Sequence, residues 1–242
     1  MVTAMVKVAV AQIKVTSKID TNLRKILDSI DKAKSKKADI VCFPEVCLNP
    51  TYKSLDVSKQ IKAIQERCKQ RSIWVIIGSH VPAGKKLKNS VFLIDRSGKI
   101  KYRYDKIHLW ISEENKITPG KVSRVIDTEF GKIGVINCQD FVFPSFIQKL
   151  SKAGAKIIFC PMYIFDFQKD ADVLRKIPLV RAFENICYFI TSAAFAPGTL
   201  AESFICHPQR VLKKIEHKEG IIYANLNLKE IDPLRKYYGH LT

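Results

Sequence analysis

Short apolar runs alternate with helical patterns along most of this 242-residue chain. Residues 5–12, MVKVAVAQ, predict a buried strand, and in 20–34 the apolar residues recur at the spacing of one helix face. The run at 38–43 predicts a second buried strand, which Pro44 ends. Because strand–helix–strand order is typical of layered folds, this pattern restricts the chain to the α/β class.

The same order continues through the rest of the chain. Further helices are predicted at 61–70, 144–153 and 174–185, and further strands at 73–79, 90–95, 100–105, 123–129, 131–137, 155–159, 188–192, 202–206 and 220–225. Neither a linker nor an internal repeat interrupts this pattern, and the length suits one large domain. We therefore expect a single α/β domain over residues 1–242, in which 232–242 lacks periodicity and forms a C-terminal arm or tail.

Cysteine usage and hydropathy exclude several classes of protein. Seven cysteines, an odd number, lie mainly in apolar strand-like runs, as expected of reduced core thiols in the cytoplasm. Cysteine and histidine do not occur at zinc-ligand spacings, so we expect neither a metal nor a cofactor. The sequence has no run of eighteen apolar residues, and lysines interrupt its opening segment, so we expect a soluble protein without a signal peptide or membrane partner.

The formal net charge of +18 raises the possibility of a nucleic-acid partner. The lysines are dispersed, however, and their densest runs, at 32–37, 84–88 and 213–218, look like solvated helix faces and turns. Binding to RNA or to a membrane surface would need these lysines to cluster on one face. We therefore expect no specific nucleic-acid partner.

Three positions at strand ends carry side chains suited to acyl transfer. Cys138 lies between the apolar strand GVIN and a helix beginning near Pro144, where backbone N–H dipoles would favour a thiolate. Glu45 follows a buried strand, where partial burial would raise its pKa enough for proton transfer near neutral pH. Lys106 ends the strand KYRYDK, where an ammonium group could stabilise an oxyanion.

Each of these residues alone also has an ordinary structural explanation. A cysteine at a strand end is commonly a core thiol, Glu45 could cap a helix or face solvent, and most lysines lie at the surface. Glu113 and Glu114, upstream of Pro119 and Gly120, are equally ambiguous.

In order and spacing, several segments together resemble the nitrilase-like carbon–nitrogen hydrolase family over nearly the whole chain. They are VAVAQ near the start, ADIVCFPE around Glu45, NSVFLIDRSGKIKYRYDKIHL through Lys106, E-x-x-x-I-x-P-G from Glu113 to Gly120, GKIGVINCQD around Cys138, GAKIIFCP at 154–161, RAFEN at 181–185 and SFICHPQRVL at 203–212. The resemblance implies a single-domain α-β-β-α sandwich that forms a homodimer or higher homo-oligomer through helices. Val173, Leu174, Ile177 and Val180 are candidates for that interface or, equally, for the internal core.

The resemblance also implies a set of catalytic roles. Cys138 would be the nucleophile, Glu45 the general base and Lys106 the oxyanion-binding group. Spacing to the Pro-Gly pair selects Glu113 over Glu114 as the glutamate that supports Lys106, although Ile117 replaces the family's usual aromatic residue. The implied activity is hydrolysis of a small amide, at a carbon–nitrogen bond other than a peptide bond, through a cysteine thioester and without a cofactor.

The segment after Cys138 departs from the family pattern. The family commonly shows C-Y/W-D-x-R-F-P-E, whereas this chain has CQDFVFPS, so an arginine and a glutamate are missing. We expect Gln139, Val142 and Phe143 to contact substrate. Phe141, Val142 and Phe143 together suggest apolar packing around an aliphatic or aromatic acyl group, although all three could equally pack into the core. Two alternatives remain open: a nitrilase or N-carbamoyl amidohydrolase, and a catalytically altered member that acts in binding or assembly.

Overall fold

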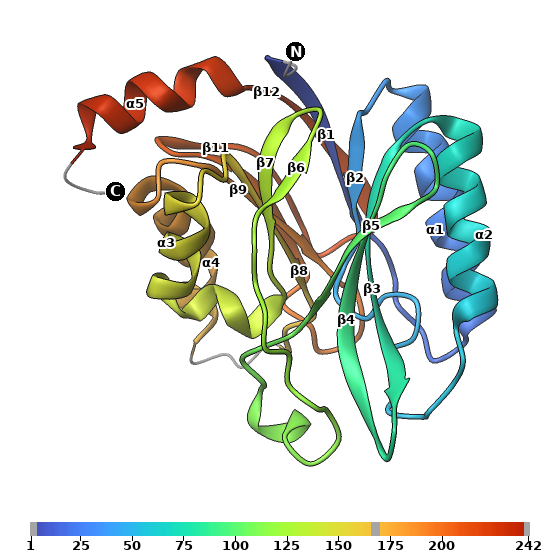
Figure 1. The fold of residues 1–242 in the computed structure, drawn as a ribbon. Helices are drawn as coiled ribbons and strands as arrows, with labels where there is room; N and C mark the ends of the chain where they lie inside the picture. Colours follow the sequence, from blue (N-terminus) through green and yellow to red (C-terminus); the bar gives the residue numbers. More distant parts are fainter. Residues whose placement is uncertain (1–3, 166–169, 240–242) are drawn as a thin grey trace.

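Two six-stranded sheets lie face to face in the centre of the molecule, and helices cover their outer faces (Figure 1). The computed structural model describes residues 4–165 and 170–239. This arrangement is the α-β-β-α sandwich predicted from the sequence. Among the described residues, no helix is both long enough and apolar enough to cross a membrane.

The first sheet contains the N-terminal strands and one strand from the C-terminal part of the chain. Its order is β12 (Gly220–Asn227), β1 (Met5–Gln12), β2 (Ile40–Cys42), β3 (Trp74–Ala83), β4 (Lys86–Ile94) and β5 (Ile100–Asp105). Strands β1, β2 and β3 are parallel, whereas the pairs β12–β1, β3–β4 and β4–β5 are antiparallel. The parallel strands are buried on both faces and therefore appear in the sequence as continuous apolar runs.

The second sheet repeats this arrangement with the remaining strands. Its order is β11 (Arg210–Glu216), β10 (Glu202–His207), β9 (Tyr188–Ala193), β8 (Ile157–Met162), β7 (Gly131–Val135) and β6 (Ile126–Thr128). Strands β7, β8 and β9 are parallel, and the outer pairs are antiparallel. Both sheets thus have parallel strands whose carboxyl ends can hold functional groups.

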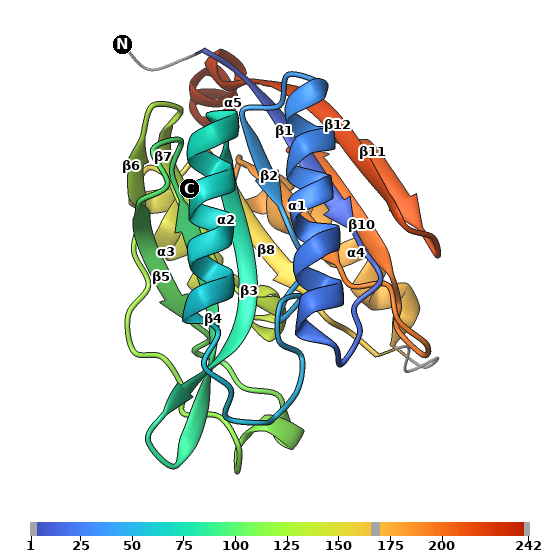
Figure 2. The same cartoon turned by 90° about the vertical axis from the view of Figure 1, so that its right-hand side faces the viewer.

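Helices α1 (Ile19–Ser35) and α2 (Ser58–Arg71) lie side by side on the outside of the first sheet (Figure 2). Helices α3 (Pro144–Lys152) and α4 (Ala171–Glu184) cover the second sheet on the opposite side (Figure 1). Side chains of successive strand residues point to opposite faces, so each strand serves two apolar layers. In β1, for example, Val8 packs between the sheets, whereas Ala9 packs toward α1 and α2.

Two elements near the C-terminus were not predicted from the sequence. Strand β11 is an edge strand whose side chains are mostly exposed, so its apolar residues show no alternation. The segment 232–242 was expected to be an arm or tail, but helix α5 (Ile231–Tyr237) occupies its first part. Only Ile231 of this helix is fully buried, which explains why no helical periodicity is visible. Residues 240–242 lie outside the described part of the chain.

Candidate active site

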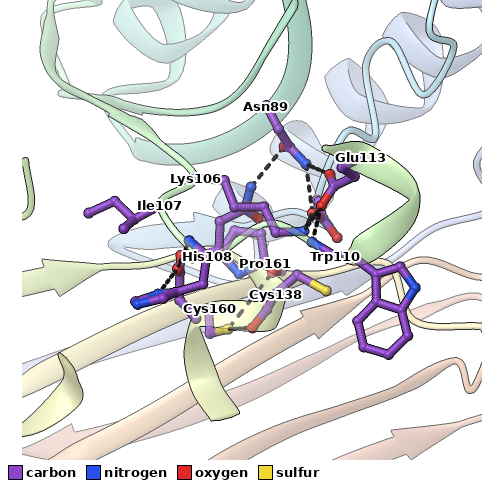
Figure 3. A network of polar contacts seen from close by, with 12 residues as sticks. Asn89, Lys106, Ile107, His108, Trp110, Glu113, Cys138, Cys160 and Pro161 are labelled. Carbon is purple, nitrogen blue, oxygen red and sulfur yellow. Dashed lines mark hydrogen bonds and ion pairs between the residues drawn. The ribbon is translucent and has the colours of Figure 1, made fainter. Parts of the chain in front are cut away.

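A buried hydrogen-bond network joins three of the predicted site residues (Figure 3). The Lys106 Nζ donates to Glu45 Oε1 at 2.9 Å and to Glu113 Oε2 at 2.8 Å. The side chains are 2%, 4% and 6% exposed, respectively, so water screens their charges weakly. The fold therefore brings Glu45 and Lys106 into contact although they are 61 positions apart in the sequence.

Asn89 on β4 is a further member of this network that sequence reasoning missed. Its Nδ2 donates to Glu45 Oε1 at 2.8 Å and to Glu113 Oε1 at 2.9 Å, and its Oδ1 accepts from Asn137 Nδ2 at 2.8 Å. Asn89 thus holds both carboxyl groups against Lys106. The signal available was an asparagine directly before the predicted strand at 90–95, because a buried amide needs hydrogen-bond partners.

Close backbone packing positions Glu45 at the end of β2. A Cβ atom at Gly78 of β3 would lie 2.6 Å from the Val46 nitrogen and 2.8 Å from the Pro44 oxygen. Only glycine leaves room for the chain to run across β3 at this point. Val46 itself has φ +43°, so the chain turns sharply directly after the glutamate.

The loop after β5 brings Glu113 back to Lys106. Gly120 N donates to the Lys106 carbonyl oxygen at 2.8 Å, and a Cβ atom at Gly120 would lie 2.0 Å from the Asp105 oxygen. The Glu113 Oε2 also accepts from Trp110 N at 2.9 Å. Glu113 is buried and Glu114 is exposed. The glutamate that contacts Lys106 is therefore Glu113, the one expected from its spacing to the Pro-Gly pair.

Cys138 lies at a sharp turn three residues beyond the end of β7, with φ +45°. The buried carboxylate of Asp140 fastens this turn, since it accepts from Asn137 N at 2.9 Å, from Tyr104 OH at 2.6 Å and from His108 N at 3.0 Å. Tyr104 and His108 flank Lys106 in the sequence. Asp140 therefore connects the cysteine turn of the second sheet to the lysine strand of the first.

The Cys138 thiol lies near the Glu45 carboxyl group and the Tyr163 backbone, and both influence its pKa. Burial raises its pKa well above the ordinary value, the Glu45 charge raises it further, and Lys106 opposes both. The expectation that N–H dipoles would favour a thiolate is therefore wrong, because desolvation outweighs them. The resting group is a thiol, which needs a base in order to react.

The pKa values of the two carboxyl groups beside Lys106 shift in opposite directions. Burial raises the pKa of Glu45, and the attraction of Lys106 only partly offsets this effect. Burial also acts to raise the pKa of Glu113, but Lys106 and the hydrogen bonds from Trp110 and Asn89 lower it overall. Burial disfavours the Lys106 ammonium, yet Glu45, Cys138 and Glu113 hold its pKa well above the ordinary value.

These residues open into a cavity of about 570 Å³. Its described lining is Glu45, Val46, Pro50, Tyr52, His80, Asn89, Lys106, Trp110, Ser112, Glu113, Cys138, Gln139, Phe141, Val142, Tyr163, Ile164, Phe165, Asp170, Val173, Leu174 and Ile177. Of the residues expected to contact substrate, Gln139 and Val142 are in this lining. Phe143 is not, because its ring stacks on His108 with the ring centroids 3.9 Å apart.

Within residues 4–165 and 170–239, no group of three or more histidine, cysteine, aspartate or glutamate side chains could hold a metal ion. The polar cluster beside Cys138 instead contains one thiol, two carboxyl groups, one ammonium group and amide donors. This set can move a proton and stabilise negative charge beside a nucleophile. It suits covalent chemistry at a polarised carbon atom.

Comparison with known proteins places this chain among enzymes with the same fold. A sequence model described as carbon-nitrogen hydrolase matches residues 7–236. The "Probable hydrolase nit2" of Schizosaccharomyces pombe is 29% identical over 96% of this chain and 95% of its own, and the mouse "Omega-amidase NIT2" is 25% identical over 95% and 91%. A carbon-nitrogen hydrolase structure from Helicobacter pylori superposes with a TM-score of 0.90 at 20% identity, covering 98% of this chain and 94% of that one.

The family match spans both sheets and all four residues of the predicted catalytic set. The relatives match almost end to end, so the resemblance is not limited to isolated motifs. The fold and the two curated relatives agree with the match. The chain belongs to the carbon-nitrogen hydrolase family, whose enzymes hydrolyse carbon–nitrogen bonds other than peptide bonds.

Proposed function

We propose that this enzyme hydrolyses amides through a thioester on Cys138. The observation that carries the proposal is that Cys138 shares one cavity wall with the buried, hydrogen-bonded set Glu45, Lys106 and Glu113. Burying this many ionisable groups costs stability unless they are paired and hydrogen-bonded. Such a cluster is therefore typical of a functional site.

In the first step, Glu45 accepts the thiol proton while the Cys138 sulfur attacks the amide carbon. Lys106 stabilises the oxyanion that forms, and it is suited to this role because its two glutamate partners keep it protonated. Glu45 then gives the proton to the departing nitrogen, so the carbon–nitrogen bond breaks and ammonia or an amine leaves. A thioester remains on Cys138.

In the second step, Glu45 accepts a proton from water, and the resulting hydroxyl group attacks the thioester carbon. The carbon–sulfur bond breaks, the sulfur regains the proton and the carboxylic acid leaves. The raised pKa of Glu45 suits a group that alternates between base and acid. Glu113 stays ionised under its lowered pKa, so its role is to hold Lys106 and to accept a hydrogen bond from the substrate nitrogen.

An amide is favoured over a nitrile or an N-carbamoyl amino acid as substrate. The mouse relative carries the name omega-amidase, and the complete cluster of Glu45, Lys106, Glu113 and Cys138 disfavours a purely binding or assembly role. Neither Gln139 nor Val142 supplies a cation that an N-carbamoyl amino acid would require.

A homodimer in the cytoplasm is the assembly and compartment that we propose. Of the four residues considered for a helix interface, Val173, Leu174 and Ile177 line the cavity, so only Val180 remains available on α4. Val180 is 46% exposed and Phe183, one turn later, is 42% exposed. All seven cysteines are free and buried, which suits a reducing compartment. Sedimentation equilibrium would test the dimer, and a monomer at micromolar concentration would contradict it.

Ammonia release from a panel of amides, nitriles and N-carbamoyl amino acids tests the function. We expect amide turnover in the wild type and loss of at least about four orders of magnitude in Cys138→Ala. Cys206→Ala is the matched control, because Cys206 is also buried but lies in β10 outside the cavity lining. Normal turnover in Cys138→Ala, or turnover of nitriles alone, would contradict the proposal.

A further inference from the structure

The apolar part of the cavity comes mainly from two segments of the second-sheet half. Phe141 and Val142 lie three and four residues after the nucleophile, and the first turns of α4 contribute Val173, Leu174 and Ile177. Residues four apart on a helix lie on one face, so Val173 and Ile177 form a continuous surface. We call the set Phe141, Val142, Ile164, Phe165, Val173, Leu174 and Ile177 the apolar wall.

Several of the exposed large apolar side chains of the molecule are gathered at this cavity. Val142 is 36% exposed, Phe165 52% and Val173 60%, and from the first-sheet half Tyr52 is 43% exposed and Trp110 41%. Exposed apolar groups in one concave place mark a binding site, because an apolar ligand removes them from water.

The charged groups of the described lining are three carboxyl groups and one ammonium group. Glu45 and Glu113 both bind Lys106, and Asp170 lies at the start of α4. The described lining contains no arginine. Lys106, the only lysine or arginine in the described lining, is therefore already paired with two carboxyl groups and is placed to stabilise charge at the reacting carbon.

A second lysine lies near the cavity but does not line it. The Lys116 Nζ stands 4.2 Å from the centre of the Tyr52 ring, and Lys116 itself is exposed. Tyr52 is in the cavity lining and Lys116 is not. The charge of Lys116 is thus directed to an aromatic face and to solvent.

We propose that this enzyme selects amides whose acyl group is uncharged and apolar, and that it discriminates against acyl groups ending in a carboxylate. This inference rests on the amidase function proposed above and specifies its substrate class. An acyl chain attached to the carbon at Cys138 would extend along the apolar wall.

Physical arguments support both halves of this selectivity. Apolar acyl carbons gain free energy when they cover exposed valine and phenylalanine side chains. A carboxylate placed against the same side chains would lose hydration without gaining a paired cation from the described lining, and Asp170 would repel it. Sites that bind carboxylates generally supply a guanidinium or ammonium group for this purpose.

Three amides of matched length provide the test: hexanamide, the monoamide of adipic acid, and 6-aminohexanamide. They share the reacting group and differ in a methyl, carboxylate or ammonium terminus. We expect kcat/KM for hexanamide to exceed each of the other two values by at least about tenfold. A smaller preference for hexanamide over either charged amide overturns the proposal.

The same experiment separates this proposal from the proposed function. If none of the three amides, nor any amide of the wider panel, releases ammonia, the amidase function fails. If the adipic monoamide is turned over best, the amidase function stands and only the selectivity proposal fails.

A pair of arginine substitutions tests whether the apolar wall causes the selectivity. Val173→Arg places a guanidinium in the cavity lining, and Val122→Arg is the control, because Val122 is 64% exposed and lies outside that lining. We expect the ratio of kcat/KM for the adipic monoamide to that for hexanamide to rise at least about tenfold in Val173→Arg and to change less than twofold in Val122→Arg. Equal ratios in the two variants would contradict a role for the wall.

Discussion

The two halves of the sandwich contribute different chemistry to one cavity. From the first-sheet half come Glu45, Asn89, Lys106 and Glu113, which are buried and hydrogen-bonded to one another. From the second-sheet half come the Cys138 sulfur and the apolar wall, much of which is exposed. A rigid polar cluster on one layer thus acts on a nucleophile and a substrate held by the other layer. Reaction rate and substrate choice should therefore respond to different substitutions.

Lys106→Met gives the largest effect expected in the first-sheet half. Removing an oxyanion-stabilising group should lower kcat/KM by at least about two orders of magnitude, and by a similar factor for every amide. Lys101→Met is the matched control, because Lys101 lies on β5, the strand that leads to Lys106, but is exposed. Steady-state kinetics with two amides checks both variants. A substrate-dependent loss in Lys106→Met would show that catalysis and selectivity are not separate.

In the first-sheet half, the burial of His80 should make the stability of the protein depend on pH. Burial lowers the pKa of His80 from 6.5 to about 4, against the hydrogen bond that its ring makes with the Thr51 carbonyl. The unfolded chain binds the proton near pH 6.5 and the folded chain only near pH 4, so stability should fall as pH decreases between these values. The contribution is at most about 3 kcal/mol.

Urea titrations from pH 7 to pH 4 would measure this contribution. We expect the free energy of unfolding to decrease less in His80→Gln than in the wild type across that range. Parallel pH profiles of the two proteins would show that His80 is not held neutral by burial.

Glu113→Gln should have a smaller effect than Lys106→Met. A glutamine keeps a hydrogen bond to Lys106 but removes one of its two negative partners, so we expect about a tenfold loss in kcat. Glu114→Gln is the control, because Glu114 is adjacent but exposed. If the two variants lose the same activity, the Glu113 carboxylate does not support the lysine.

Most of the fold was predictable because the buried strands and amphipathic helices leave strong patterns. Helix α1, for example, shows apolar residues such as Ile26, Ile30 and Ala33 on one face, all of which are buried. Strand β11 and helix α5 escaped prediction because their contacts are mostly at the surface. Patterns of burial cannot reveal elements that bury little.

The site was only partly predictable, since sequence spacing fixes neither register nor solvent exposure. Glu45, Lys106, Glu113 and Cys138 were located by motif and lie together in the structure. Asn89 joins them because of its position in the β3–β4 pairing, opposite His80. The protonated state of Cys138 depends on burial, and the position of Phe143 depends on its stacking on His108. These three features depend on the three-dimensional structure and cannot be deduced from the sequence alone.

Trapping the acyl-enzyme tests most directly whether the polar cluster of the first sheet acts on the sulfur of the second. The wild type and Cys138→Ala would be mixed with hexanamide and quenched in acid during turnover, and intact and peptide masses would be measured. We predict one hexanoyl group on the peptide that contains Cys138 and none in the alanine variant. Hydrolysis without any adduct on Cys138, or an adduct on one of the six other cysteines, would contradict the account.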